Sequence, residues 1–592
     1  MRRAHVVVPL AMLGCACASA ARRGTSPGTS PADSVARIAD AYYAAMLAEQ
    51  PEQAILLGVT PPRHDGLSDA SPAWLASWHA REDAWLAALD AIDPAALAGS
   101  PAWITHGALG EQLAASRQLR VCRMPLWAGV NHMESWHTIL AVVAERQPVD
   151  TEEERAQALA RWGKVPRFLR QELDNLRAGL ASGYSAPRPV AERMLAQLDG
   201  LLPAAGAAPL EHPFASPAAR AKDPAFRDAF LALLEREVLP AMREYRAFLA
   251  AEYVPRARTS IAVTALPDGA ACYRALLRAA TTLDRTPEQV FALGREVVAR
   301  YSDDVRAAGL RLFGEADFAT IVRKVKDAPA NHYADPNDLL PDSRELVARA
   351  EAAMPRFFVA VPDQPVVVEP IPAYQDGPGA SSHYIPPGDG RPGVYRISLL
   401  RPGGTSRAEA EITAFHETWP GHHLQIAYAQ RVKGLHPVNQ LLFNSGYAEG
   451  WGRYAEQLAE EAGLYRSDFG KIERRAWPGR GMVVDPAIHA MGWTREQAIA
   501  FLVESGRFDE RTAPRVVDRI AALPGQLTSY DSGAQEFLAL RREAEAALGA
   551  RFDLRRFHDA LLDHGTIPLS MLRQRMRRWV AEERAPAKFP GP

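Results

Sequence analysis

The stretch FHETWPGHHLQ at residues 415–425 constrains this chain more than any other part of its sequence. It brings three histidines and one glutamate together within eight residues. Imidazole and carboxylate groups are common zinc ligands, and a catalytic zinc takes three protein ligands and leaves one position open for water. The stretch therefore predicts a zinc site, held by a scaffold that the rest of the chain provides.

The spacing of the histidines departs from the common helical zinc motif. In His-Glu-x-x-His, two histidines one turn apart face the metal, and the glutamate lies beside the bound water. His416 and Glu417 match the start of this motif, but Pro420 stands where the second histidine is expected. On a straight helix, His423 would lie about 10 Å further along the axis than His416. That separation is too large for two imidazoles that each bind one metal at about 2 Å.

A kink at the proline would solve this problem. Proline removes a backbone hydrogen bond and bends a helix, and the following Gly421 tolerates strained backbone. Such a kink would return His422, which otherwise points off the face, to the metal. We therefore predict His416 and His422 as zinc ligands, with His423 as the weaker candidate. The alternative is that these histidines cap helices or fill a core.

A third ligand is expected from another helix, and the stretch SGYAEGWGRYAE at residues 445–456 offers one. Glu449 lies among small and aromatic residues, which favours a buried carboxylate. Glu456, two turns later on the same face, could accept a hydrogen bond from a ligand. An ordinary solvated acidic face describes Glu460 and Glu461 better. We therefore predict Glu449 as the third ligand.

A zinc hydrolase also needs a general base and a donor for the developing oxyanion. Glu417 is the predicted base, because it directly follows His416. Tyr530 and His489 are the candidate donors, since both lie in polar interruptions of the helical C-terminal part. A capped core tyrosine and a satisfied core histidine are equally compatible with these two positions.

Two further residues are candidates for substrate binding. Arg480 could bind a substrate carboxylate through its planar guanidinium, although a surface arginine explains this residue better. Tyr395 lies in the alternating segment 394–399, which predicts a β-strand. An extended peptide could pair with this strand, and a core strand is an equal alternative.

The composition predicts a mostly α-helical fold. Ala, Leu, Arg and Glu dominate the sequence, and β-branched runs are few. Residues 35–592 are expected to form one large helical body, in which residues 353–592 carry the active site. Residues 223–253 predict a long amphipathic helix, and residues 384–393 predict a loop rich in proline and glycine. The strand 394–399 is the convincing β element, just before the metal-binding helix.

The N-terminus predicts export. Residues 1–20 combine a positively charged start with a short apolar core, as signal peptides do. Two processing routes compete: ordinary cleavage at Ala18-Ser19-Ala20, or lipidation of Cys15 in a lipoprotein box. Residues 21–34 predict a flexible tether. The protein is then expected in the periplasm or anchored by a lipid to the cell envelope.

The net charge limits the binding partners that we expect, and the cysteine content leaves two states open for Cys122 and Cys272. The formal net charge of -2 gives no reason to expect nucleic acid or an anionic membrane surface. We expect a peptide or amide substrate, membrane contact only through a lipid at Cys15, and no particular oligomeric state. A disulfide between Cys122 and Cys272 is compatible with export, and two buried free thiols are at least as compatible.

Several stretches, spread over most of the chain, together resemble the bacterial DUF885 family, a domain of unknown function. Members of this family look like helical zinc metallopeptidases of the gluzincin type, similar in plan to the carboxypeptidase and angiotensin-converting-enzyme-like groups. The stretches that carry the resemblance are HETWPGHHLQ (416–425), YAEGWGRYAE (447–456), YYAAMLAEQPEQAILLGV (42–59), DGAACYRALLRAATTLDRTPEQVFALG (268–294), VVDPAIHAMGWTREQAI (483–499), LPGQLTSYDSG (523–533) and FDLRRFHDALLDHGTIPL (552–569).

The resemblance implies that His416, His422 and Glu449 bind the zinc and that Glu417 is the general base. Two departures from the family pattern concern substrate contacts more than the metal. The chain has Pro486-Ala487 where the family tends to have a Thr-Gly pair. It also has Asp531-Ser532 where lysine and an apolar residue are more usual.

The function expected from these features is that of an exported zinc metallopeptidase. One alternative is a catalytically silent binding protein of the cell envelope, which keeps the fold and a structural metal. Another is a metallohydrolase that acts on amides other than peptides. The intact Glu417 argues against the silent protein, because a purely structural metal site needs no general base.

Overall fold

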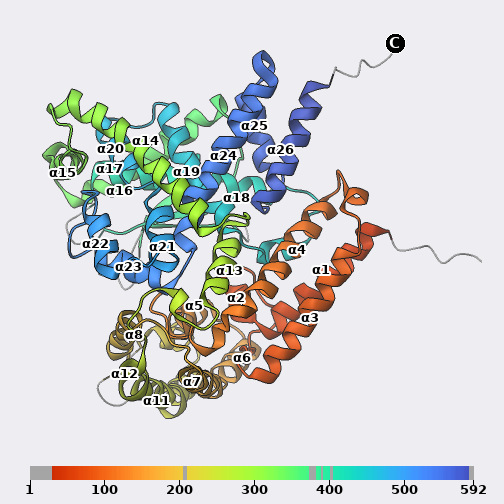
Figure 1. Cartoon of the computed structure of the whole chain (residues 1–592). Helices are drawn as coiled ribbons and strands as arrows, with labels where there is room; N and C mark the ends of the chain where they lie inside the picture. Colours follow the sequence, from red (N-terminus) through yellow and green to blue (C-terminus); the bar gives the residue numbers. More distant parts are fainter. Residues whose placement is uncertain (1–29, 204–209, 372–381, 389–390, 400–404, 586–592) are drawn as a thin grey trace, which may run out of the picture.

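The computed structural model confirms a mostly helical protein with one small mixed β-sheet (Figure 1). The predicted signal peptide, with Cys15, lies outside the part of the chain that the structure describes. None of the described helices is long and apolar enough to cross a membrane. The structure describes residues 30–203, 210–371, 382–388, 391–399 and 405–585.

The first four helices form one side of the molecule, and each begins at a proline (Figure 1). Proline suits the first position of a helix, where its missing N–H removes no helical hydrogen bond. The first helix begins earlier than the predicted Val35, because Ser30 and Asp33 close its N-terminus as a capping box. The end of the predicted tether is therefore helical. These helices are α1 (Pro31–Glu49), α2 (Pro51–Leu56), α3 (Pro72–Asp90) and α4 (Pro101–Leu119).

The next helices enclose a separate apolar core made from residues 130–257. We call this part the helical unit. The long helix predicted at 223–253 is confirmed as α10 to α12, which two π-helical segments join into one continuous element. The helices of the unit are α5 (Trp136–Arg146), α6 (Glu152–Trp162), α7 (Val165–Ala181), α8 (Arg188–Leu201), α9 (Ser216–Arg220), α10 (Pro224–Leu233), α11 (Leu239–Phe248) and α12 (Val254–Arg256).

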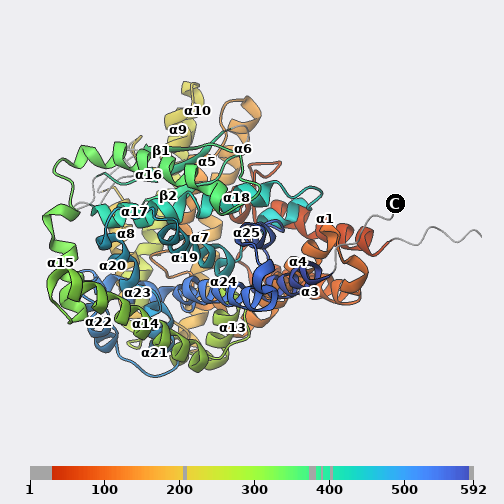
Figure 2. The same cartoon turned by 90° about the horizontal axis from the view of Figure 1, so that it is seen from above.

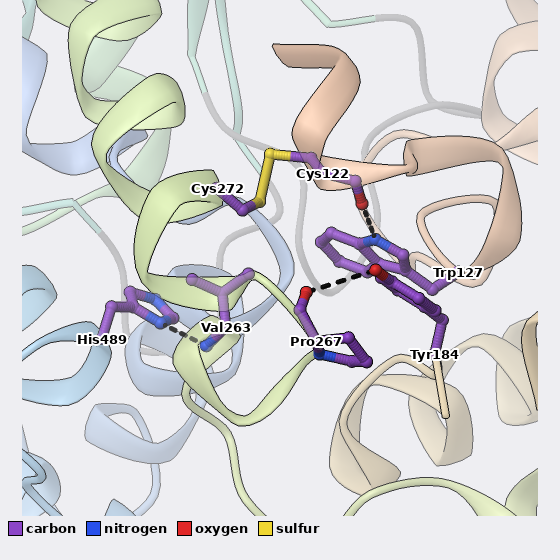
Figure 3. The surroundings of a disulfide bond; sticks show 7 residues. All are labelled: Cys122, Trp127, Tyr184, Val263, Pro267, Cys272 and His489. Carbon is purple, nitrogen blue, oxygen red and sulfur yellow. Dashed lines mark hydrogen bonds between the residues drawn. A yellow bond between two sulfur atoms is a disulfide. The ribbon is translucent and has the colours of Figure 1, made fainter. Parts of the chain in front are cut away.

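A disulfide bond joins the two ends of the chain segment that contains the helical unit. Cys122 and Cys272 are 150 residues apart in sequence, and their Cα atoms are 4.7 Å apart. Figure 3 shows the bond between the short 3-10 helix that follows α4 (Arg120–Cys122) and α13 (Gly269–Thr281). The indole of Trp127 donates to the carbonyl oxygen of Cys122 at 2.8 Å. Of the two alternatives for these cysteines, the structure contains the disulfide.

The β-sheet has three short strands, and the predicted strand is its central one. β3 (Gly393–Ile397) pairs in parallel with β1 (Val366–Pro370) and antiparallel with β2 (His383–Ile385). The strand β2 lies partly in the segment predicted as a loop. Because both edges of β3 are occupied, no extended peptide can pair with it. The peptide-pairing alternative is therefore wrong, and Tyr395 lies in a core strand.

The remaining helices build the C-terminal half, and two of them lie at its centre. In Figure 2, α19 and α24 lie between α17 and α18 on one side and α13, α14 and α21 on the other. The helices not yet given are α14 (Pro287–Phe313), α15 (Phe318–Asp327), α16 (Leu339–Ala353), α17 (Arg407–Glu417), α18 (His422–Gln430), α19 (Ser445–Glu461), α20 (Asp468–Ala476), α21 (Arg480–His489), α22 (Arg495–Val503), α23 (Ala513–Ala522), α24 (Gln526–Leu548), α25 (Leu554–Leu562) and α26 (Leu569–Arg584).

Glycines let the two central helices touch through their backbones. A Cβ atom at Gly450 of α19 would lie 2.5 Å from the Cα of Gly533 in α24. A Cβ at Gly533 would collide with the carbonyl oxygen of Gly446. Only glycine fits at such a close approach of two helices. The contact brings the polar residues of α24 next to the predicted metal ligand on α19.

Candidate metal centre

The helix that begins the histidine-rich stretch breaks where a kink was predicted. α17 ends at Glu417, and α18 starts afresh at His422. A Cβ at Gly421 would collide with the carbonyl oxygen of His416, so the backbone returns on itself at this glycine. The indole of Trp451 on α19 donates to the carbonyl oxygen of Pro420 at 2.9 Å and holds the break in place. The predicted kink is therefore confirmed.

The break brings the three predicted ligands together. The Nε2 atoms of His416 and His422 lie 3.4 Å and 3.7 Å from the same carboxylate oxygen of Glu449. One ligand atom from each residue can be chosen so that all three lie within 4.8 Å of one another. Two atoms bound to one tetrahedral zinc at about 2.0–2.1 Å are about 3.3 Å apart. Among the described residues, this is the one group of its kind that could hold a metal ion.

A buried ion-pair network contacts the second ring nitrogen of His416, the one that does not face Glu449. Nδ1 of His416 lies 2.9 Å from a carboxylate oxygen of Glu456, the residue predicted for this contact. Arg453 donates to both oxygens of Glu456 at 2.7 Å and 3.0 Å. A histidine that ligates a metal commonly uses its second nitrogen in this way, which fixes the orientation of its ring.

The same contacts set the charges of the site. Burial opposes protonation of His416, but Glu449 and Glu456 outweigh it and raise the pKa of His416 to about 10. Burial works against ionisation of Glu449, yet the two imidazoles hold its pKa well below the usual range. Without a metal, His416 is therefore protonated, and its positive charge lies beside the carboxylates of Glu449 and Glu456.

A glycine on α19 makes room for the first imidazole. A Cβ atom at Gly452 would lie 2.5 Å from Cε1 of His416. Any side chain here would push the ring away from Glu449. This glycine lies one turn before Glu456, so one face of α19 both receives the imidazole and supports it.

The third histidine of the stretch serves the scaffold. Nε2 of His423 lies 2.9 Å from the carbonyl oxygen of Gln364, and its Nδ1 lies 2.8 Å from the hydroxyl of Tyr384 on β2. Nε2 therefore donates and Nδ1 accepts the hydroxyl proton. Burial lowers the pKa of His423 to about 4, which keeps the ring neutral. His423 ties the sheet to α18, and neither nitrogen is free for a metal.

Tyr530 lies beside the candidate metal centre. It belongs to α24, which begins at Gln526 and includes the residues predicted as a polar interruption. The guanidinium carbon of Arg453 lies 5.6 Å from the centre of the Tyr530 ring. Burial and the negative charge of Glu449 raise the pKa of Tyr530, so its hydroxyl keeps its proton and remains a donor.

The predicted general base stands at the end of α17, next to Tyr395. Burial and then the charge of Glu417 raise the pKa of Tyr395 far above its usual value. A cavity of about 130 Å³ runs along the face of α17 that carries Glu409 and Thr413, and Tyr395 lines it. Residues at positions i, i+4 and i+8 share one helix face, so Glu417 follows Glu409 and Thr413 on the face of α17 that lines this cavity.

One predicted site residue, His489, has a structural role instead, and another, Arg480, is buried. His489 accepts the N–H of Val263 at 3.0 Å through Nδ1 (Figure 3). Its Nε2 lies 3.1 Å from the carbonyl oxygen of Ile520. With both nitrogens engaged, His489 has no donor for an oxyanion, and the core alternative holds. Arg480 is 5 % exposed, with its guanidinium 4.9 Å from the ring centre of Phe318. It is therefore not a surface arginine, and its role in substrate binding stays a prediction.

The sequence interpretation missed several residues that shape the site. Arg453 was not singled out, because an arginine within an acidic helix looks like a surface residue until the partner helices are placed. The spacing of Gly446 and Gly450, four residues apart on one helix face, was an available signal for a close helix contact. Tyr384 carried no such signal, since its contact with His423 depends on the sheet.

Fold and site together define a helical protein in which two histidines and a glutamate from three helices could hold a metal ion. Residues 51–576 match the family described as "Bacterial protein of unknown function (DUF885)". The chain belongs to this family.

Two solved structures share the fold. A "putative lipoprotein" from Colwellia psychrerythraea has a TM-score of 0.83 at 22% identity, and the match covers 94% of this chain and 100% of that chain. A "putative lipoprotein of unknown function" from Shewanella oneidensis has a TM-score of 0.73 at 20% identity, with 93% and 100% covered. No curated protein matches the chain. Because both identities are low, these structures support the fold alone.

Proposed function

We propose that this protein is an exported, zinc-dependent metallopeptidase, with His416, His422 and Glu449 as the metal ligands. The observation that carries the proposal is the cluster of two imidazole nitrogens around one carboxylate oxygen, at 3.4 Å and 3.7 Å. These distances match the separation of ligand atoms around a tetrahedral zinc. Glu417 directly follows the first ligand, in the position of the general base of helical zinc hydrolases.

The donor set favours zinc over other common cations. Calcium and magnesium prefer oxygen ligands in larger numbers, whereas two imidazoles and one carboxylate are typical of catalytic zinc. Three protein ligands leave a position open for water. When bound, zinc supplies a Lewis acid that brings the pKa of water near 7.

Four side chains of the protein are assigned to proton transfer, stabilisation of the oxyanion and orientation of His416. Glu417 takes a proton from the attacking water and gives it to the leaving amine. The hydroxyl of Tyr530, which keeps its proton beside Glu449, donates to the substrate oxygen as negative charge develops there. Glu456 and Arg453 hold the ring of His416 in one orientation.

Three observations bear on export. The N-terminal sequence has the order of a signal peptide, with Cys15 in a lipoprotein box. The two structures that share the fold are described as putative lipoproteins. The disulfide Cys122–Cys272 also fits an oxidising compartment, because such bonds persist outside the cytosol. We propose a periplasmic location, with the lipid-anchored form as the variant that Cys15 permits.

Elemental analysis of the purified protein tests the metal. We expect one zinc per chain in the parent and none in His416→Ala. A matched control is His436→Ala, because His436 contacts Asp40 near the surface and should leave the metal content unchanged. If the parent takes up no metal after zinc is added, the hydrolase is refuted, and a silent binding protein becomes the better account.

Hydrolysis of a peptide library then tests the reaction. We expect Glu417→Gln to keep its zinc and to lose activity by about 10²–10⁴-fold, the usual contribution of a general base. A variant that cleaves peptides as fast as the parent would remove Glu417 from the mechanism. If zinc is bound but only non-peptide amides are cleaved, the substrate class is wrong while the metal centre stands.

A further inference from the structure

One arginine next to the helix of Tyr530 forms no ion pair with the residues that the structure describes. Arg519 lies on α23 and donates from Nη2 to the side-chain oxygen of Gln526 at 2.9 Å. Its Nε is buried and has no hydrogen-bond partner among the residues that the structure describes. No carboxylate in the described part of the chain forms an ion pair with it. A buried charge is normally paired, so an acceptor that reached this Nε would be favoured.

The neighbouring carboxylate on the same helix is already satisfied. Asp518 binds Arg193 at 2.6 Å and Arg495 at 3.0 Å. Two arginines therefore share the one acid next to Arg519 and leave Arg519 without it. Its hydrogen bond to Gln526 places Arg519 one turn from Tyr530 on α24. The charge of Arg519 opposes the burial that raises the pKa values of Tyr530 and Glu134.

These neighbours place Arg519 between the metal centre and the helical unit. Tyr530 lies close enough to Glu449 for the charge of that predicted ligand to affect it. Glu134 belongs to the segment before α5, and Asn131 of this segment donates to the carbonyl oxygen of Ala522 at the end of α23 at 3.1 Å. Arg519 thus lies where the helical unit meets the C-terminal half, near the proposed catalytic residue Tyr530.

We infer that Arg519 binds a carboxylate group of the substrate. The inference rests on the proposed peptidase function and names the recognition element that it requires. A guanidinium presents a planar fork of donors that matches a carboxylate in two parallel hydrogen bonds. Gln526 holds one side of this fork, and the buried Nε remains to be satisfied by an acceptor. The carboxylate is the free C-terminus of a peptide or an acidic side chain.

Direct binding to the exported, metal-free protein tests the inference without relying on turnover. The probes are acetyl-Ala-Ala with a free C-terminus, its C-terminal amide, and acetyl-Ala-Glu amide, each titrated by calorimetry. We expect an acid probe to bind the parent at least about tenfold more tightly than the neutral amide, as for other charge-assisted pairs. The two acid probes show whether the carboxylate comes from the C-terminus or from a side chain.

Variants of two arginines on α23 test whether Arg519 causes the preference for acids. Arg519→Gln should bind acids and the neutral amide alike, and Arg519→Lys should retain part of the preference, since a lysine keeps the charge but not the fork. The matched control is Arg515→Gln, one turn earlier on α23, because Arg515 is exposed and should not change the preference. Parental unfolding temperatures in all three variants would show that the fold is intact.

The outcomes separate this inference from the proposed function. A preference for acids that is lost in Arg519→Gln supports the carboxylate site, even if no peptide is hydrolysed. Equal binding of acid and amide by the parent, or no binding of either acid at millimolar concentration, overturns it. Cleavage of acid and amide substrates at equal rates, with an unchanged ratio in Arg519→Gln, overturns the inference while the peptidase stands.

Discussion

The helical unit and the C-terminal half bury their charges very differently. Within residues 130–257, Arg161 is the one fully buried Asp, Glu, Lys or Arg side chain that the structure describes. The described C-terminal residues 405–585 bury nine such side chains. These are Glu411, Glu456, Glu473, Arg474, Arg480, Asp485, Asp518, Asp531 and Glu536.

The difference teaches how a reactive site fits into a helical body. An apolar core tolerates similar side chains in many arrangements, and it stabilises the unit without specifying chemistry. Buried charges require defined partners, because an unpaired one destabilises the fold strongly. The C-terminal half therefore fixes its side chains through ion pairs and glycine contacts, and these contacts also position the residues of the candidate metal centre.

Breaking the glycine contact should have the largest effect. Gly533→Val places a branched side chain against the backbone of Gly446 and Gly450, where the helices cannot separate without losing the site. We expect a loss of more than about 4 kcal/mol of stability, in the range reserved for severe steric changes. Thermal unfolding measures the effect. Unfolding at the parental temperature would mean that α19 and α24 do not lie this close.

Removing the disulfide should destabilise the other region. In Cys122→Ser with Cys272→Ser, the long loop between these residues is no longer closed in the unfolded chain. We expect a loss of about 2–5 kcal/mol in denaturant unfolding, with unchanged zinc content. Reduction of the parent should give the same loss. A variant as stable as the oxidised parent would show that the bond does not restrain the unit.

Disturbing the support of the first imidazole should weaken metal binding without unfolding the protein. Glu456→Gln removes the carboxylate that orients His416 and balances Arg453. We expect an affinity for zinc that is about 10–100-fold lower, as for other residues behind a metal ligand. Glu461→Gln, on an exposed part of the same helix, is the matched control. Equal affinities in the two variants would remove Glu456 from the metal centre.

Metal affinity should also depend on pH. The pKa of about 10 for metal-free His416 means that its ring is protonated at neutral pH, and zinc must displace the proton on Nε2 that faces Glu449. Affinity should therefore rise with pH, by about tenfold per unit below pH 10 if one proton is released. Competition with a chelator at pH 7 and pH 8 measures the slope. An affinity independent of pH would contradict this charge state.

The smallest effect is expected in the helical unit. Gly200 lies in α8, and a Cβ atom added there would have no neighbour within 4 Å. Gly200→Ala should raise stability by about 0.5–1 kcal/mol, because alanine loses less backbone freedom in a helix. The contrast with Gly533→Val sharpens the difference between the regions. A destabilised Gly200→Ala protein would show that this helix face is packed more tightly than the structure has it.

The parts of the site that lie close in sequence were predictable, and those that depend on distant contacts were not. The kink followed from Pro420 and Gly421, and the pairing of Glu456 with His416 followed from helix spacing. The buried contacts of His489 and Arg480 are with Val263, Ile520 and Phe318, which no local pattern connects to them. Periodicity gives the face of a helix but not the neighbour that this face meets.

The same limit applies to the fold. Helix type was predictable because it is largely a local property of residues such as those of α10 to α12. The sequence predicts a loop where the short strand β2 lies, since its three residues are held in the sheet by pairing with β3. The state of Cys122 and Cys272 stayed open for the same reason, because a bond across 150 residues leaves no trace in local sequence.

The disulfide also has a topological consequence. Because the Cα atoms of Cys122 and Cys272 are 4.7 Å apart, the chain leaves the main body and re-enters it at almost the same point. The helical unit is thus an insertion whose two ends are joined by the disulfide. The chain before Cys122 and the chain after Cys272 meet at almost the same point. Such an insert can change in length or sequence while the helices that carry the histidines keep their course.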